Sequence, residues 1–143
     1  MTENTPMNGF NTQSNNVEDS SKTNTSRKSL FVDISFSNGV MNACIVGPRV
    51  GEREATVVAN ALNAQLKEYG DKVTSLVLDF SEIQFVSSLG LGMCIDVRNT
   101  AEQINASTTI AGLTTHLKEL FEMMRLDRLF TITSNSSSYG SAA

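Results

Sequence analysis

Apolar residues are concentrated between residues 30 and 133, and their spacing there predicts strands and helices in alternation. In some stretches they recur at every second residue or in short runs, as in strands, and in others at intervals of three and four, as in amphipathic helices. The predicted strands lie at residues 30–36, 40–46, 73–80, 107–111 and 129–133. The predicted helices lie at residues 52–69 and 89–104, with a third that Thr114 or Thr115 can cap. The predicted order is therefore β-β-α-β-α-β-α-β.

This order of elements predicts one α/β domain. Turn residues at 37–39 join the first two strands as a hairpin, whereas every later step from strand to strand passes through a helix. The centre of the third strand, Leu76-Val77-Leu78, is apolar on both faces, as in the buried strands of parallel sheets. We therefore expect a mainly parallel sheet with an antiparallel edge hairpin and helices packed on it.

The two ends of the chain differ from this region in composition. More than half of residues 1–29 are Asn, Ser or Thr, and residues 134–143 contain five serines and no charged side chain. Segments of this kind bury too little apolar surface to offset the entropy of ordering them. We interpret residues 1–29 as a disordered N-terminal tail, residues 30–133 as the domain and residues 134–143 as a flexible C-terminal tail.

Composition and charge exclude several classes of function. The 143 residues include 11 basic and 15 acidic side chains, and the net charge of −4 argues against binding to nucleic acid. Cys44 and Cys94 have neither zinc-site nor disulfide-scaffold spacing, and His116 is the only histidine, so we expect no metal site and no cofactor. Without a membrane-spanning apolar run or a signal-peptide pattern, we expect a cytoplasmic protein that does not bind membranes.

Residues 76–92 carry the most informative chemistry, because a buried strand ends at Asp79 and a turn leads into Ser87-Ser88 directly before a helix. A hydroxyl at this junction lies at the N-cap or in the first turn, beside backbone N–H groups without a partner in the helix. The positive end of the helix dipole favours a negative group there, so a phosphate on Ser88 would not unfold the domain. The alternative is purely structural: Ser88 caps the helix, and Gly90 and Gly92 let it pack closely on the sheet.

Three segments of the domain resemble the STAS domain of anti-sigma factor antagonists, which regulate bacterial transcription by partner switching. Residues 78–91, Leu-Asp-Phe-Ser-Glu-Ile-Gln-Phe-Val-Ser-Ser-Leu-Gly-Leu, resemble the family's strand, turn and phosphorylation loop. Ile110-Ala111-Gly112-Leu113 resembles the strand and turn before the last helix, and residues 126–132, Leu-Asp-Arg-Leu-Phe-Thr-Ile, resemble the closing segment after it. The resemblance covers about residues 30–133, and its first segment is the most specific.

The resemblance implies a site of serine phosphorylation. The family's loop reads Asp-Ser-Ser-Gly, and the serine after the aspartate is phosphorylated by the cognate anti-sigma kinase. Aligning Gly90 with that glycine puts Ser87 at the aspartate position, Ser88 at the phosphoacceptor and Leu89 at the second serine. We therefore expect phosphorylation on Ser88, with Ser87 as the alternative. The corner expected to bind a partner comprises Val86, Ser87, Ser88, Leu89, Gly90 and Leu91.

The resemblance also implies the partners. The unphosphorylated protein would bind an anti-sigma factor that has serine-kinase activity, and so free a sigma factor. Phosphorylation adds about −1.5 to −2 charges and would break this contact, and a PP2C-type phosphatase would restore it.

Two other classes of function compete with this interpretation. An enzyme is disfavoured because the chain has no GxGxxG or GxxxxGK[ST] phosphate-binding motif and no GxSxG motif, and His116 opens a predicted helix. A STAS module that does not switch, either a scaffold or an accessory subunit of a lipid-transport ATPase, would dock through the same corner without phosphorylation. Because Ser87 replaces the family's aspartate, this second alternative stays open.

Overall fold

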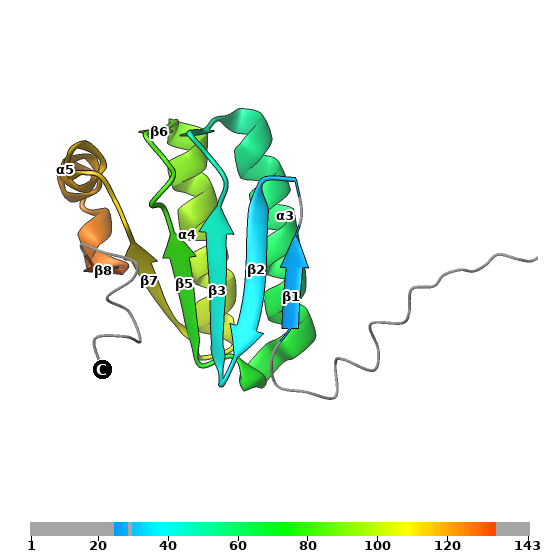
Figure 1. Ribbon diagram of the computed structural model, residues 1–143. Helices are drawn as coiled ribbons and strands as arrows, with labels where there is room; N and C mark the ends of the chain where they lie inside the picture. The colour runs from blue at the N-terminus through cyan, green and yellow to red at the C-terminus, as the bar shows by residue number, and fades with distance from the viewer. Residues whose placement is uncertain (1–24, 29, 134–143) are drawn as a thin grey trace, which may run out of the picture.

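A six-stranded sheet runs through the part of the chain that the computed structural model describes, residues 25–28 and 30–133 (Figure 1). The strands, in their order across the sheet, are β1 (Thr25–Lys28), β2 (Val32–Ser37), β3 (Val40–Ile45), β5 (Ser75–Asp79), β7 (Ser107–Ala111) and β8 (Thr131–Thr133). The β1–β2 and β2–β3 pairs are antiparallel, and the β3–β5, β5–β7 and β7–β8 pairs are parallel. The predicted α/β class, with a mainly parallel sheet and an antiparallel hairpin, is confirmed.

The helices are arranged around one face and one edge of the sheet. Helices α3 (Glu52–Tyr69) and α4 (Ser88–Gln103) lie side by side on the same face, and α5 (Thr115–Met123) lies near the β7–β8 edge (Figure 1). Short 3₁₀ helices, η2 (Gly70–Lys72) and η3 (Leu126–Arg128), follow α3 and α5. Helices that join adjacent parallel strands in one direction cover the same face because such crossovers are right-handed. No helix among the described residues is long and apolar enough to span a membrane.

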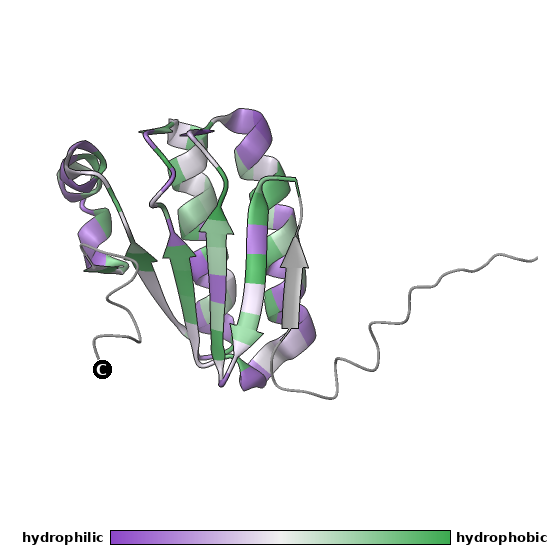
Figure 2. Cartoon of the chain, in the orientation of Figure 1, coloured by the Kyte–Doolittle hydropathy of each residue, from purple (hydrophilic) through white to green (hydrophobic). Residues whose placement is uncertain are grey.

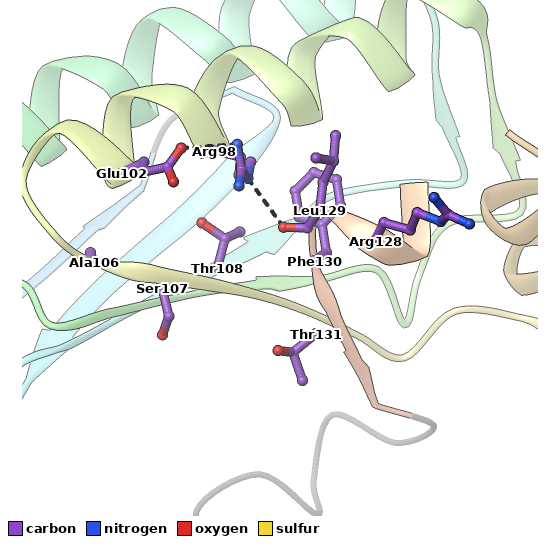
Figure 3. Close-up of a pocket in the computed structure, with 9 residues that line it drawn as sticks. All are labelled: Arg98, Glu102, Ala106, Ser107, Thr108, Arg128, Leu129, Phe130 and Thr131. Carbon is purple, nitrogen blue, oxygen red and sulfur yellow. Dashed lines mark hydrogen bonds and ion pairs between the residues drawn. The ribbon is translucent and has the colours of Figure 1, made fainter. Parts of the chain in front are cut away.

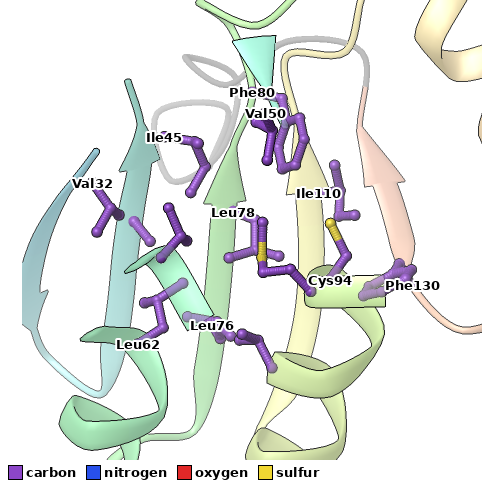
Figure 4. Close-up of a cluster of buried hydrophobic side chains, with 14 of the residues drawn as sticks. Val32, Ile45, Val50, Leu62, Leu76, Leu78, Phe80, Cys94, Ile110 and Phe130 are labelled. Carbon is purple, nitrogen blue, oxygen red and sulfur yellow. The ribbon is translucent and has the colours of Figure 1, made fainter. Parts of the chain in front are cut away.

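The core lies between the sheet and the two long helices. Hydrophobic and hydrophilic residues alternate along β2 and along α3, whereas the centre of β5 is hydrophobic throughout (Figure 2). Leu76, Val77 and Leu78 are all buried in β5, which confirms the prediction of a buried parallel strand. Figure 4 shows side chains from several strands and both helices meeting in this core: Val32, Ile45, Leu62, Leu76, Leu78, Cys94 and Ile110.

Strand β1 corrects the predicted start of the domain. The composition predicts a disordered tail through residue 29, but Thr25–Lys28 pair with β2, from Thr25 opposite Phe36 to Lys28 opposite Asp33. An edge strand is held by backbone hydrogen bonds, so it needs no apolar pattern of its own. Residues 1–24, 29 and 134–143, the rest of both predicted tails, lie outside the described residues.

The last strand and the second helix begin at different residues than predicted. Strand β8 begins at Thr131, because the Leu129 N–H donates to Leu126 O at 2.9 Å and closes the η3 turn instead. Helix α4 begins one residue earlier, at Ser88, whereas α3 has the predicted bounds.

Candidate functional site

A second, two-stranded sheet positions the corner that contains the candidate phosphoacceptor. Strands β4 (Arg49–Val50) and β6 (Phe85–Val86) run parallel, with Arg49 opposite Phe85 and Val50 opposite Val86. They lie where α3 and α4 begin (Figure 1). The Ser87 N–H continues the pairing by donating to Val50 O at 2.9 Å. The first residues of α4 are therefore held against the chain that leads into α3.

Two backbone turns that contact each other closely support this small sheet, one at Gly47-Pro48 and the other just before Phe85. The N–H groups of Gln84 and Phe85 both donate to Pro48 O, at 2.7 and 3.2 Å. A Cβ on Gly47 would lie 2.3 Å from Glu82 O, so only glycine allows the turns to approach this closely. The Gly47 N–H also donates to the Glu82 carboxylate Oε1 at 3.4 Å, so contacts between segments 35 residues apart in sequence support the corner.

Ser87, and not Ser88, is the N-cap of α4. Its backbone is extended, with φ −78° and ψ 171°, and its Oγ accepts a hydrogen bond from the Gly90 N–H at 3.1 Å. This is the usual contact between a capping side chain and the third residue of a helix. The structural alternative that Ser88 caps the helix is therefore wrong, because the helix begins one residue earlier than its apolar pattern predicts.

Ser88 is the first residue inside α4, and its side chain is exposed. Among the described residues, no hydrogen-bond partner is found for its hydroxyl. A phosphate at this position would lie beside the unpaired backbone N–H groups of the first turn, at the positive end of the helix dipole. Of the two adjacent serines, Ser87 is engaged in capping, whereas Ser88 presents an exposed hydroxyl.

The remaining residues of the predicted corner divide into surface and interior. Leu89 is 52% exposed, and Phe85, which lies outside the predicted corner, is 50% exposed. Val86, Gly90 and Leu91 are buried and can act only by supporting the surface. The exposed surface, which we call the Ser88 corner, consists of Phe85, Ser88 and Leu89.

The two glycines of α4 have different roles. A Cβ on Gly90 would lie 2.7 Å from Val86 Cγ1 and 2.9 Å from Val50 O, so close packing of α4 on the small sheet requires glycine there. A Cβ on Gly92 would meet nothing within 4 Å. The expectation of close packing holds for Gly90 and is wrong for Gly92.

A groove of about 250 Å³ between α3 and α4 adjoins the Ser88 corner. Small side chains and Gly92 form part of its wall, Leu89 lies at one end, and Glu52 and Asp96 are its acidic residues. Asp96 is held in place, because its Oδ2 accepts a hydrogen bond from Asn63 Nδ2 at 2.9 Å. The groove is lined by Glu52, Ala55, Thr56, Ala59, Leu89, Gly92, Met93 and Asp96.

Besides the acidic residues of the groove, one cation and one held carboxylate lie beside the corner. The Arg49 guanidinium lies 5.1 Å from the centre of the Phe85 ring, within the range of a cation–π contact. Glu54 accepts a hydrogen bond from the Gly51 N–H at 2.9 Å at the start of α3. Its own backbone N–H and that of Gly51 lower the pKa of the Glu54 carboxyl, so it is ionised at neutral pH.

The cysteines and the histidine lie away from this site. Burial, with the nearby carboxylates of Asp79, Glu82 and Asp33, raises the pKa of Cys44 to about 11. Burial also raises the pKa of Cys94 to about 12, so neither thiol is a reactive nucleophile at neutral pH. His116 is exposed in the first turn of α5. Within residues 25–28 and 30–133, no group of His, Cys, Asp or Glu side chains could hold a metal ion.

The chain matches a known domain family and is similar in fold to several solved structures. Residues 49–132 match the family model described as the Mlab, STAS domain. An anti-sigma factor antagonist from Mycobacterium paratuberculosis has a TM-score of 0.64 at 16% identity, over 83% of this chain and 92% of that one. A STAS domain protein from Planctomyces limnophilus has a TM-score of 0.67 at 12% identity, over 78% of this chain and 95% of that one.

The anti-sigma factor antagonist SpoIIAA is similar in fold in both of its states. Its unphosphorylated form has a TM-score of 0.59 at 9% identity, over 83% of this chain and 94% of that one. The phosphorylated form of the Bacillus protein has a TM-score of 0.57 at 10% identity, over 84% of this chain and 99% of that one. No significant match is found among curated protein sequences.

Proposed function

Because the chain belongs to the STAS domain family, we propose that it is a cytoplasmic anti-sigma factor antagonist whose binding is switched by phosphorylation of Ser88. In its unmodified form it binds an anti-sigma factor with serine-kinase activity, and a sigma factor is released. Phosphorylation of Ser88 ends this binding, and a PP2C-type phosphatase reverses the modification. The protein thereby regulates transcription without contacting nucleic acid.

The observation that carries the proposal is the difference between the two adjacent serines. The Ser87 hydroxyl is used to cap α4, whereas the Ser88 hydroxyl is exposed and has no partner among the described residues. A kinase can reach Ser88 without breaking an existing hydrogen bond. Modification of Ser87 would instead remove the cap of α4, so Ser88 is the better acceptor.

The surface around Ser88 favours a protein partner in the unmodified state. Phe85 and Leu89 expose apolar surface on either side of Ser88 in sequence, and the groove between α3 and α4 begins at Leu89. A phosphate would place about −1.5 to −2 charges beside this surface, near the acidic Glu52 and Asp96 of the groove. Desolvation of that charge in a contact costs several kcal/mol, or about 10²–10³ in affinity.

The test is to incubate the full chain and ATP with candidate kinase anti-sigma factors, and to map the modified residue by mass spectrometry. We expect phosphate on Ser88, none in Ser88→Ala and normal phosphorylation in Thr115→Ala. Thr115 is the matched control because it is also the exposed first residue of a helix, after a capping Thr114 that accepts from the Leu117 N–H at 3.1 Å. Phosphate on Ser87 would show that Ser87, and not Ser88, is the phosphoacceptor.

The same experiment separates the switch from a STAS module that does not switch. A partner that binds the chain stably but never phosphorylates it would contradict the switch and favour a scaffold or an accessory subunit of a lipid-transport ATPase. That outcome would leave the Ser88 corner as a docking surface, which Leu89→Asp would disrupt. Leu89 is exposed, so this substitution tests binding without disturbing the core.

A further inference from the structure

A second cavity lies at the other end of α4, between that helix and the start of β8 (Figure 3). Strand β8 begins with Thr131 opposite Thr109, so none of the described strands lies beside Thr108 on this side of β7. The resulting space has a volume of about 260 Å³. We call it the Arg98 pocket, and its walls include Arg98 and Glu102 of α4, Thr108 of β7, and Arg128 and Leu129 before β8.

Arg98 is fixed in the wall of this pocket with part of its guanidinium unused. Its Nε donates to Leu129 O at 3.1 Å, and its Nη1 lies 3.0 Å from Glu102 Oε1 and 3.4 Å from Asn99 Oδ1. Among the described residues, no partner is found for Nη2. The side chain is only 24% exposed, so the contacts hold its planar group in one orientation. A guanidinium fixed in this way is suited to binding an oxyanion.

Thr108 adds a second unused donor to the same pocket. The residue is 6% exposed, and its Oγ1 is buried without a hydrogen-bond partner. Figure 3 shows its side chain projecting from β7 toward Arg98 of α4. Buried hydroxyls nearly always have a partner, so an unpartnered one in the wall of a cavity suits a ligand that supplies the acceptor.

The charge of the pocket favours an anion. Its lining contains two arginines and one carboxylate, Glu102, whereas the whole chain has a net charge of −4. Arg128 is exposed and has no ion pair or hydrogen bond from its side chain among the described residues. Figure 3 shows its guanidinium extending away from Arg98. Because it has no partner among the described residues, it can turn toward a bound anion without losing a contact.

We propose that the Arg98 pocket binds a small molecule through one oxyanion group, a carboxylate or a phosphate monoester. Arg98 Nη2 and the Thr108 hydroxyl donate to the anion, and Arg128 closes over it. The volume is just below the ~300–1,000 Å³ of pockets for drug-sized ligands, which limits the ligand to a short organic acid or a small phosphate ester. Arg98 is ten residues from Ser88 along α4, about 15 Å, so this site is independent of the proposed switch.

The test is an NMR titration of the ¹⁵N-labelled full chain with inorganic phosphate and, separately, with acetate, at constant ionic strength. We expect saturable shifts of the Thr108, Leu129 and Phe130 amides with at least one of the two anions. Tighter binding of phosphate identifies the phosphate ester, and tighter binding of acetate identifies the carboxylic acid. Shifts that do not saturate, or that map elsewhere on the chain, would show adventitious binding and overturn the proposal.

Thr108→Val is the decisive variant because it keeps the shape of the side chain and removes only the hydroxyl. We expect it to weaken anion binding roughly tenfold while the thermal midpoint stays the same or rises, since the lost hydroxyl had no partner. Arg98→Met should abolish binding, but it also releases Leu129 O and so lowers the midpoint.

Thr115→Val and Arg53→Met, at exposed positions at the starts of α5 and α3, are the controls and should bind as the unsubstituted chain does. Unchanged affinity in Thr108→Val would contradict the site.

Discussion

At the scale of single residues, the start of α4 shows how one step along the chain separates a serine that caps the helix from one with an exposed hydroxyl. Ser87 is extended, which brings its Oγ within reach of the Gly90 N–H, whereas Ser88 already has helical backbone angles and its side chain is exposed. The same side-chain chemistry therefore has two roles, because the helix begins between the two residues. Ser88 keeps a free hydroxyl because the neighbouring Ser87 supplies the cap of α4.

This difference predicts unequal effects of removing the two hydroxyls. Ser87→Ala should lower the free energy of unfolding by about 1 kcal/mol, because it leaves the Gly90 N–H without its cap. Ser88→Ala should change it by less than about 0.5 kcal/mol, as is usual for exposed positions. Urea unfolding of both variants measures the difference. A larger loss in Ser88→Ala would mean that Ser88 has a structural partner.

The two glycines of α4 give a second matched pair. Gly90→Ala should destabilise the domain by about 1–3 kcal/mol, because the new Cβ would overlap Val86 and the Val50 carbonyl. Gly92→Ala should stabilise it by about 0.5–1 kcal/mol, because its Cβ meets open space and alanine favours the helix. Thermal unfolding of both variants checks the prediction, and equal effects would contradict the close approach at Gly90.

The cysteines yield a prediction about reactivity. Raised pKa values of about 11 for Cys44 and about 12 for Cys94 keep both thiols protonated at pH 8. Because the thiolate is the nucleophile, a thiol-specific reagent should label the folded chain far more slowly than the chain in urea. Fast labelling of the folded chain would place at least one thiol in a different environment.

At the scale of elements, the sequence predicts those parts of the fold that carry their own periodicity. Helix α3 has the predicted bounds, and β5 is buried on both faces as its Leu-Val-Leu centre indicates. Strand β1 and the two-residue strands β4 and β6 escape prediction, because they are short and held by backbone pairing, which leaves no pattern in the side chains.

The sequence likewise predicts the location of the candidate site, but not which of its side chains are exposed. The Ser87-Ser88 junction before a helix is visible in the sequence, but which serine caps depends on a shift of one residue that periodicity does not resolve. Leu91 was expected at the partner surface, yet it is buried, whereas the exposed Phe85 was missed. Which side chains of the corner are buried depends on the small β4–β6 sheet, which has no recognisable pattern in the sequence.

Helix α5 provides a prediction at this scale. The Phe121 ring packs edge-on against Phe80 and Phe130, with centroids 6.2 and 6.4 Å apart, and this contact joins α5 to the end of the sheet. Phe121→Ala should cost about 3–5 kcal/mol. Met123→Ala, in the same helix but 76% exposed, should cost less than about 0.5 kcal/mol. Chemical denaturation of the two variants tests this, and a small loss in Phe121→Ala would show that α5 is not needed to close the core.

At the scale of the whole molecule, α4 carries both proposed sites, and the two would involve opposite charges. Its first turn presents Ser88, where a phosphate would add negative charge, and its third turn presents Arg98 in a pocket whose lining has one more arginine than carboxylates. The helix itself is fixed by Gly90 at one end and by the Arg98–Leu129 contact at the other. A charge added to the exposed Ser88 would leave these contacts in place, so its effect should fall on binding and not on folding.

This separation of binding from folding is testable by placing one negative charge at two equivalent helix starts. Ser88→Asp and Thr115→Asp each put a carboxylate on the exposed first residue of a helix, where the dipole favours it, so both thermal midpoints should stay within a few degrees of the unsubstituted chain. Only Ser88→Asp lies beside Phe85 and Leu89, so only it should weaken binding to the anti-sigma factor, by about tenfold or more, as measured by calorimetry. Unfolding of Ser88→Asp would show that Ser88 is structural, and equal affinities of the two variants would show that the partner docks elsewhere. Both results would contradict a switch that works through charge at a preformed corner.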